Sequence, residues 1–232
     1  MPDAPQPIHL RPVAALADRV LLPGDPGRAL ALAQVVLGDD RKMFNHHRGL
    51  WGYTGTAADG APLTIQSTGM GGPSAAIVLE ELAALGVRTA VRVGTARALA
   101  PTVALGELVA ATAVHGADGV SRALGALGRH PLDGPITAHL AQVATRAGLI
   151  VSTDLFYAVD DESDGTAWTA DGALAVDLES APLAAVAARH GLAFGAIVAV
   201  IADARGGRLG EEAVAQAGEA VGVAGAGALT SG

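Results

Sequence analysis

The chain has 232 residues, half of them hydrophobic, and a net charge of −8 with no cysteine. This length suits one domain, placed at 1–232, and the lack of cysteine excludes disulfides, thiolate metal sites and a cysteine nucleophile. The acidic balance argues against a nucleic-acid partner. No uncharged run of about 18 residues and no signal-peptide pattern is found, so we expect no membrane partner and a cytoplasmic location.

In chain order, apolar runs bounded by glycine, proline or polar turns alternate with segments of helical periodicity. The predicted strands cover residues 19–23, 50–57, 61–68, 89–94, 107–115, 174–178 and 193–203, and residues 148–159 predict a further strand that leads into a loop. The predicted helices cover residues 29–37, 74–86, 135–148, 179–192 and the tail from 211, which we expect to fray over 222–232. Residues 160–172 are polar and predict a mobile loop. This alternation predicts an α/β domain around a mixed sheet.

Glycines mark three of the predicted strand ends: the turns GDPGR and GMGGPS each follow a strand, and the segment RVGT closes another. Ligands of open α/β sheets gather at the carboxyl ends of strands, where glycines let backbone N–H groups approach an anion. Arg28, Arg48 and Arg92 are therefore candidates for one anion site, with Thr95 as a further donor. Each arginine taken alone is more typical of a surface ion pair. Arg92 differs, because it lies inside an apolar strand and a buried guanidinium needs an anionic partner.

Three acids are the other candidate functional groups. Asp177 and Glu179 are two residues apart in a strand or at its end, so both carboxylates face the same way and suit a diol, a metal or a cation. The alternative is a helix N-terminus, where acids stabilise the dipole. Asp203 ends the apolar run AIVAVIAD and is a candidate general acid, or else a turn former. The seven histidines show no metal-ligand spacing, so no metal is predicted.

Seven segments carry a resemblance when taken in order: LLPGDPGR, NHHRGLWGYTG, TGMGGPSAAIVLEEL, VRVGTARAL, DLFY, VDLESAPL and VIAD. From about residue 7 to 204 the chain resembles the nucleoside phosphorylase family of hexameric bacterial purine nucleoside phosphorylases and uridine phosphorylases. The resemblance implies a three-layer α/β sandwich with a central mixed, partly barrel-like sheet flanked by helices. It also implies a homohexamer built as a trimer of dimers, with sites shared across each dimer.

The resemblance implies the reaction as well. Phosphate displaces the base of a ribonucleoside or deoxyribonucleoside, giving the free base and the pentose 1-phosphate, with no cofactor besides phosphate as co-substrate. The residues that match the family's phosphate site are Gly24, Arg28, Arg92 and Thr95, with Arg48 similar to an arginine given by the neighbouring subunit.

The nucleoside site follows by the same matching. Glu179 would bind the ribose hydroxyls, Met70 would pack on the sugar, and Phe156 would stack on the base. His9 would reach the 5′-hydroxyl from the neighbouring subunit, and Asp203 would give a proton to purine N7. The remaining matched positions are Val176, Asp177 and Leu178 around the nucleoside, and Ala96, Arg97 and Ala202 in the base pocket.

Two departures leave alternatives open. Arg97 stands where the family has a glycine against the base, and we expect the segment around it to be a tight loop. Its side chain either turns to solvent or enters the base pocket. The arginine that supports the aspartate has no clear match, although Arg205 and Arg208 lie nearby. A uridine phosphorylase, a hydrolytic nucleosidase and a diverged nucleoside-binding protein therefore remain as alternatives to a purine phosphorylase.

Overall fold

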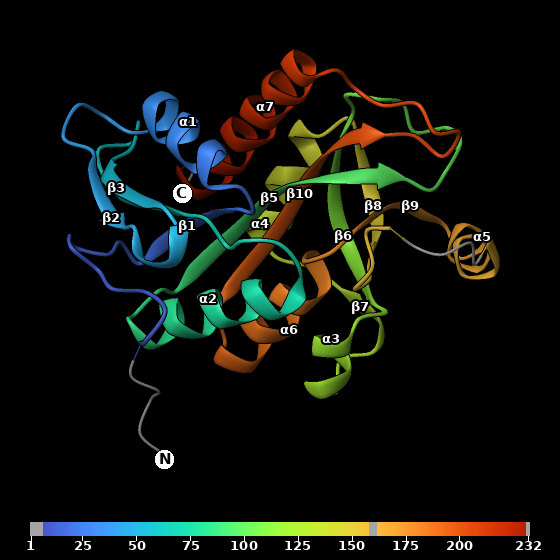
Figure 1. The fold of residues 1–232 in the computed structure, drawn as a ribbon, viewed down its shortest axis with the longest axis horizontal. Helices are drawn as coiled ribbons and strands as arrows, with labels where there is room; N and C mark the ends of the chain where they lie inside the picture. Colours follow the sequence, from blue (N-terminus) through green and yellow to red (C-terminus); the bar gives the residue numbers. More distant parts are fainter. Residues whose placement is uncertain (1–6, 158–161, 231–232) are drawn as a thin grey trace.

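The computed structural model describes residues 7–157 and 162–230. Helices lie on both faces of a central sheet (Figure 1). In that view, α1 and α7 lie above the sheet, and α2 and α6 lie below it. The predicted three-layer α/β architecture is therefore confirmed.

The elements alternate along the chain as the hydrophobic pattern predicts. The strands are β1 (Arg19–Pro23), β2 (Lys42–Asn45), β3 (Gly52–Thr56), β4 (Pro62–Gln66), β5 (Thr89–Ala98), β6 (Leu108–Gly116), β7 (Gly128–Pro131), β8 (Arg146–Ser152), β9 (Ala173–Asp177) and β10 (Ala193–Ala202). The helices are α1 (Pro26–Val36), η1 (His47–Gly49), α2 (Gly72–Ala84), α3 (Gly119–Ala123), α4 (Pro135–Val143), α5 (Glu162–Ala170), α6 (Ser180–His190) and α7 (Glu211–Thr230).

Five of the strands close into a ring, which makes the sheet partly barrel-like. Their order is β10, β6, β8, β9, β5, and β5 returns to pair with β10. β1, β4, β3 and β2 continue the sheet outward from β5. One core packs β5, β6 and β10 against α2 and α6, and a second packs their other side against α1, α4 and α7.

Strand β5 changes neighbours along its length. Its residues Thr89 to Val93 pair with β1, whereas Arg97 and Ala98 pair with β9. The expected strand over 89–94 is therefore too short, and the expected tight loop around Arg97 is wrong, because pairing with β9 and β10 extends the strand through Ala98.

The helix predicted over 135–148 is partly wrong. α4 ends at Val143, and Arg146 begins strand β8 in register with Val109 of β6. The Arg146 guanidinium also donates to Glu107, 2.6 Å from Nε to Oε2, which holds the start of the strand. The small residues Ala147 and Gly148, which suggested a helix end, therefore lie inside a sheet. Tertiary pairing overrides the local signal here.

Other differences involve segments with weak periodicity. The short elements β2, α3 and β7 were not predicted. The segment 148–159, predicted as a strand that leads into a loop, is in β8 up to Ser152, and residues 158–159 lie outside the described part. The polar segment expected as a loop over 160–172 forms α5 from Glu162 to Ala170, and residues 160–161 lie outside the described part. No helix within the described residues is long and apolar enough to cross a membrane.

The C-terminal segment is helical to Thr230, so the expected fraying over 222–230 is wrong. Its glycines have a packing role. A Cβ at Gly222 would overlap the Leu32 side chain of α1, and one at Gly225 would overlap Val93 of β5. The small residues therefore let α7 approach the sheet and α1 closely, and burial compensates for the low helix propensity of glycine.

We predict that Gly225→Ala lowers the free energy of unfolding by about 1–3 kcal/mol, because the added methyl overpacks the contact with β5. Gly227→Ala in the same helix is the control. A Cβ there meets only His139 Nε2, at 3.5 Å. This control variant should be neutral or stabilised by up to about 1 kcal/mol. Denaturant unfolding measures both, and equal stability of the two variants would contradict the packing role.

Candidate functional site

The carboxyl ends of several parallel strands meet at one edge of the sheet. β1 runs parallel to β4 and β5, and β5 runs parallel to β10. The turns after β1 and β4 touch, since Gly69 N–H donates to the carbonyl of Gly24 over 3.0 Å. A Cβ at Gly24 would lie 3.2 Å from the Gly69 carbonyl oxygen. The glycine-rich turns predicted separately therefore form one continuous backbone surface.

Arg92 is the buried cation of this edge, with 2% of its surface exposed. Its Nη2 lies 2.9 Å from Asp177 Oδ2 and 2.5 Å from Glu179 Oε2, and its Nε donates to Asp177 and Ser180. Burial alone lowers the pKa of Arg92, but the attraction of Glu179 and Asp177 outweighs it and the pKa is raised. Arg92 therefore has the anionic partners that its burial requires.

The two predicted acids are fixed by further hydrogen bonds. Asp177 accepts from the Ser152 hydroxyl over 2.6 Å and from the backbone N–H of Ser180 at the start of α6. Glu179 accepts from Gly71 N–H over 2.6 Å. The two acids thus bind a cation of the chain itself, and Asp177 also accepts from a backbone N–H at the start of α6. Two of the interpretations left open by the sequence, a bound cation and a helix N-terminus, therefore both apply. The sequence analysis missed Gly71, Ser152 and Ser180.

One nitrogen of Arg92 has no partner. Its Nη1 is buried without a hydrogen bond within the described residues. The guanidinium folds over Gly94, where a Cβ would lie only 2.6 Å from Nη2 and 2.7 Å from Cζ. Gly94 therefore admits the folded conformation, and the hydrogen-bonding capacity of the buried Nη1 is left unused in the described part of the chain.

Arg28 lies close to Arg92. Asp25 caps α1 and accepts from the Arg28 backbone N–H over 2.6 Å, so Arg28 sits in the first helical turn. Its side chain packs beside Gly218 of α7 and is half-buried. Burial lowers the pKa of Arg28, Asp25 opposes this, and the positive charge of Arg92 lowers it further. No hydrogen bond or ion pair of this guanidinium occurs within the described residues, which leaves a cation at a helix N-terminus available to an anion.

His9 and Arg48 lie in a different part of the chain. His9 Nδ1 is 2.7 Å from Glu81 Oε1, and the Glu81 carboxylate also accepts from the N–H groups of residues 8–10. Burial raises the pKa of Glu81, but these hydrogen bonds together outweigh it and the pKa is lowered. Arg48 is exposed in η1 with φ of 60°, and its side chain makes no hydrogen bond or ion pair within the described residues.

Asp203 follows the last residue of β10 and closes its own turn. Its Oδ1 accepts from the N–H groups of Arg205 and Gly207, each over 2.8 Å. The turn-former interpretation is thus correct, and Oδ2 carries no hydrogen bond within the described residues. Arg205 and Arg208 are exposed, and their side chains make no hydrogen bond or ion pair with Asp203 there.

The remaining predicted residues lie around the same strand ends. Strand pairing places Ala202 of β10 and Val176 of β9 on either side of Arg97, which is exposed. Ala96 is buried, and Thr95 and Leu178 are half-buried. Met70 and Phe156 are 87% and 61% exposed, and Phe156 contacts Tyr157 edge-on with ring centroids 4.9 Å apart. The side chains of Met70 and Phe156, expected to contact the sugar and the base, are therefore open to solvent in the described part of the chain.

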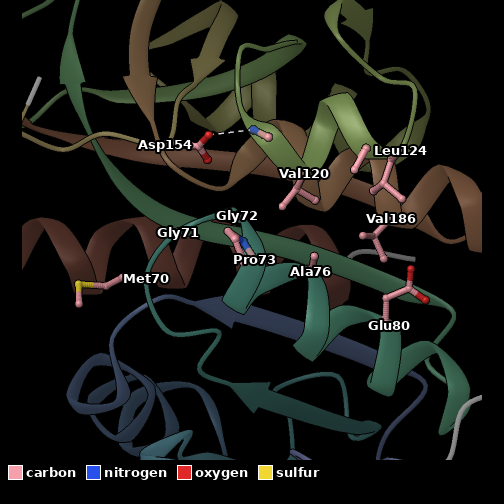
Figure 2. Close-up of a pocket in the computed structure, with 12 residues that line it drawn as sticks. Met70, Gly71, Gly72, Pro73, Ala76, Glu80, Val120, Leu124, Asp154 and Val186 are labelled. Carbon is pink, nitrogen blue, oxygen red and sulfur yellow. Dashed lines mark hydrogen bonds between the residues drawn. The ribbon is translucent and has the colours of Figure 1, made fainter.

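A separate cavity of about 750 Å³ lies between α2, α3 and α6 (Figure 2). Its walls are mainly apolar, and its charged lining residues are Glu80 and Asp154. Figure 2 shows Met70 at one end of the cavity, and Asp154 accepts from Gly119 N–H at the opposite wall. Because both charges are negative, this cavity does not suit an anion. No group of side chains that could hold a metal ion occurs in the described part of the chain.

The sequence of the chain matches those of known proteins. Residues 18–229 match the Phosphorylase superfamily. A DeoD-type purine nucleoside phosphorylase of Caldanaerobacter subterraneus subsp. tengcongensis is 34% identical over 189 residues, covering 76% of this chain and 79% of that protein. A guanosine phosphorylase of Halorubrum lacusprofundi is 36% identical over 205 residues, covering 85% of this chain and 83% of that protein.

A solved structure agrees on the fold. Uridine phosphorylase from Vibrio fischeri ES114 superposes with a TM-score of 0.83 at 22% identity, covering 94% of this chain and 93% of that one. The chain therefore belongs to the Phosphorylase superfamily, and the resemblance carried by its ordered motifs is confirmed.

We predict that Asp177→Asn lowers the free energy of unfolding by about 3 kcal/mol, because it removes one of the two charges that neutralise buried Arg92. Asp171→Asn, at an exposed carboxylate after α5, is the matched control and should change stability by less than about 0.5 kcal/mol. Urea unfolding at pH 7 compares them. A stable Asp177→Asn protein would show that Asp177 is not needed to hold the guanidinium.

Proposed function

We propose that the chain is a nucleoside phosphorylase that cleaves purine ribonucleosides or deoxyribonucleosides with phosphate, releasing the base and the pentose 1-phosphate. The observation that carries the proposal is the pairing of two cationic donors at the strand ends: buried Arg92 with Nη1 unpartnered, and half-buried Arg28 without a side-chain partner in the described residues. Similarity to purine nucleoside and guanosine phosphorylases supports the choice of substrate class.

In this proposal, phosphate binds between the turn after β1 and the middle of β5. Gly24 N–H, the Arg28 guanidinium, Arg92 Nη1 and Thr95 would donate to its oxygens. The two negative charges of Asp177 and Glu179 balance the two positive charges of Arg28 and Arg92. The phosphate anion therefore needs another cation. We assign that role to Arg48 of a neighbouring subunit, in a homohexamer built as a trimer of dimers. Its exposed position without a partner in the described chain supports the assignment.

The nucleoside would lie beside this phosphate. Each oxygen of Glu179 already accepts one hydrogen bond, and a carboxylate has about four acceptor positions, so it can also accept from the ribose hydroxyls. Exposed Met70 and Phe156 would cover the sugar and the base, and Val176 and Leu178 would complete the wall. His9 of the neighbouring subunit, oriented by Glu81, would contact the 5′-hydroxyl.

The charges suit cleavage of a glycosidic bond. Positive charge develops on the sugar in an oxocarbenium-like transition state, and a phosphate anion beside it stabilises that charge. Negative charge develops on the leaving base, where Asp203 Oδ2 would supply a proton at N7. The turn hydrogen bonds to Oδ1 orient this carboxyl group, which supports its role as the donor.

The proposal predicts that cleavage of inosine, guanosine or adenosine depends on phosphate. Arg28→Met should raise the KM for phosphate at least about tenfold, because one charge-assisted contact is lost. Arg129→Met, an exposed arginine of β7, is the control and should leave this KM unchanged. Steady-state kinetics with varied phosphate measures both. Equal cleavage without phosphate would instead identify a nucleosidase, and binding without turnover would identify a diverged binding protein.

A second prediction concerns Asp203. Asp203→Asn should reduce adenosine cleavage much more than inosine or guanosine cleavage, because adenine depends on a proton at N7 whereas a 6-oxopurine also disperses charge onto its carbonyl oxygen. The ratio of kcat/KM values for the two substrate types measures this. Equal losses for all substrates would rule out the proton-donor role.

A further inference from the structure

Arg97 is a cation at the strand ends that the phosphate site does not use. Its backbone lies in register with Ala202 of β10 on one side and Val176 of β9 on the other. Each of these residues precedes an acid, Asp203 and Asp177 respectively. Arg97 therefore occupies the centre of three strand ends, beside the proposed proton donor.

The direction of Arg97 follows from strand alternation. Residues two apart on a strand face the same side, so Arg97 shares a face with Thr95, whereas Arg92 projects from the opposite face. Two residues of strand span about 6.6 Å. Arg97 is therefore about this far along β5 from Thr95, the proposed phosphate contact. Phosphate and base lie on opposite sides of the same sugar carbon, so this distance suits a side chain that binds the base.

The charge of Arg97 is not satisfied by the protein. Arg97 is exposed and makes no hydrogen bond or ion pair within the described residues. Asp177 is committed to Arg92 and Ser152, and Asp203 directs Oδ1 to its own turn. The residues beside Arg97 in sequence and across β10 are alanines, which leave room for the guanidinium to approach a ligand.

We propose that Arg97 is a specificity-determining residue that donates to the carbonyl oxygen at position six of a purine base held beside Asp203. This inference rests on the proposed phosphorylase function. A guanidinium has donors only, so it matches the carbonyl of hypoxanthine or guanine and opposes the amino group of adenine. Arg97 also stabilises the negative charge that reaches this oxygen as the base leaves, while Asp203 acts at N7.

The test compares kcat/KM for inosine and adenosine at saturating phosphate. The wild-type protein should prefer inosine, and Arg97→Met should lower kcat/KM for inosine about 10- to 100-fold with little change for adenosine, the range expected for one lost discriminating contact. Arg97→Lys should retain part of the preference. Arg88→Met is the matched control, since this exposed arginine lies at the opposite end of β5, and it should leave the ratio unchanged.

Two results would overturn the proposal. One is an equal loss for both substrates in Arg97→Met, and the other is a rise for both, which would show that the arginine obstructs the pocket. If the wild-type protein cleaves no nucleoside with phosphate, the proposed function fails separately. Calorimetry with hypoxanthine and adenine then decides the role of Arg97. A preference for hypoxanthine that is lost in Arg97→Met supports it, and equal or absent binding of both bases overturns it.

Discussion

The candidate site depends on keeping one arginine charged inside a sheet. Arg92 is almost completely buried, and its charge is held by Asp177 and Glu179, which join the end of β9 to the start of α6. These two acids are tied in turn to β8 through Ser152 and to the turn before α2 through Gly71. A single ion cluster therefore connects the strand ends with two helix starts, and it is rigid because every partner is itself hydrogen-bonded.

Strand β5 changes neighbours next to this cluster. β1 ends its pairing at Val93 and β9 begins at Arg97, so Gly94, Thr95 and Ala96 lie between two pairing partners. Ligands of α/β sheets bind where such a change of direction leaves a crevice at the carboxyl ends of strands. In the proposed function, the phosphate side is set by Arg28 and Arg92, and the base side by Arg97 and Asp203. The rise per residue along β5 then fixes the distance between the phosphate side and the base side.

Much of this was predictable from the sequence. The sequence predicted that the glycine turns after β1 and β4 lie close together and that the charge inside VRVG has an anionic partner, and the structure shows both. The shared anion site itself stays a prediction. The partners of Arg92 were visible only as two acids of undetermined role, since nothing local says that residues 85 positions apart meet. The length of β5, the start of β8 at Arg146 and the packing of α7 were missed for the same reason. Each of these features is decided by a neighbouring strand or helix. Local propensity treats glycine and alanine there as signs of weak structure, although their role is to allow close packing or strand pairing.

The central claim is that the free nitrogen of Arg92 and the unpartnered guanidinium of Arg28 form a phosphate site. A crystal structure of the protein grown with phosphate tests it most directly. We predict a phosphate ion within hydrogen-bond distance of Arg92 Nη1 and of the Arg28 guanidinium, between the turn after β1 and Thr95. A phosphate bound elsewhere, or Arg92 Nη1 hydrogen-bonded to a protein group while phosphate is present, would contradict this claim.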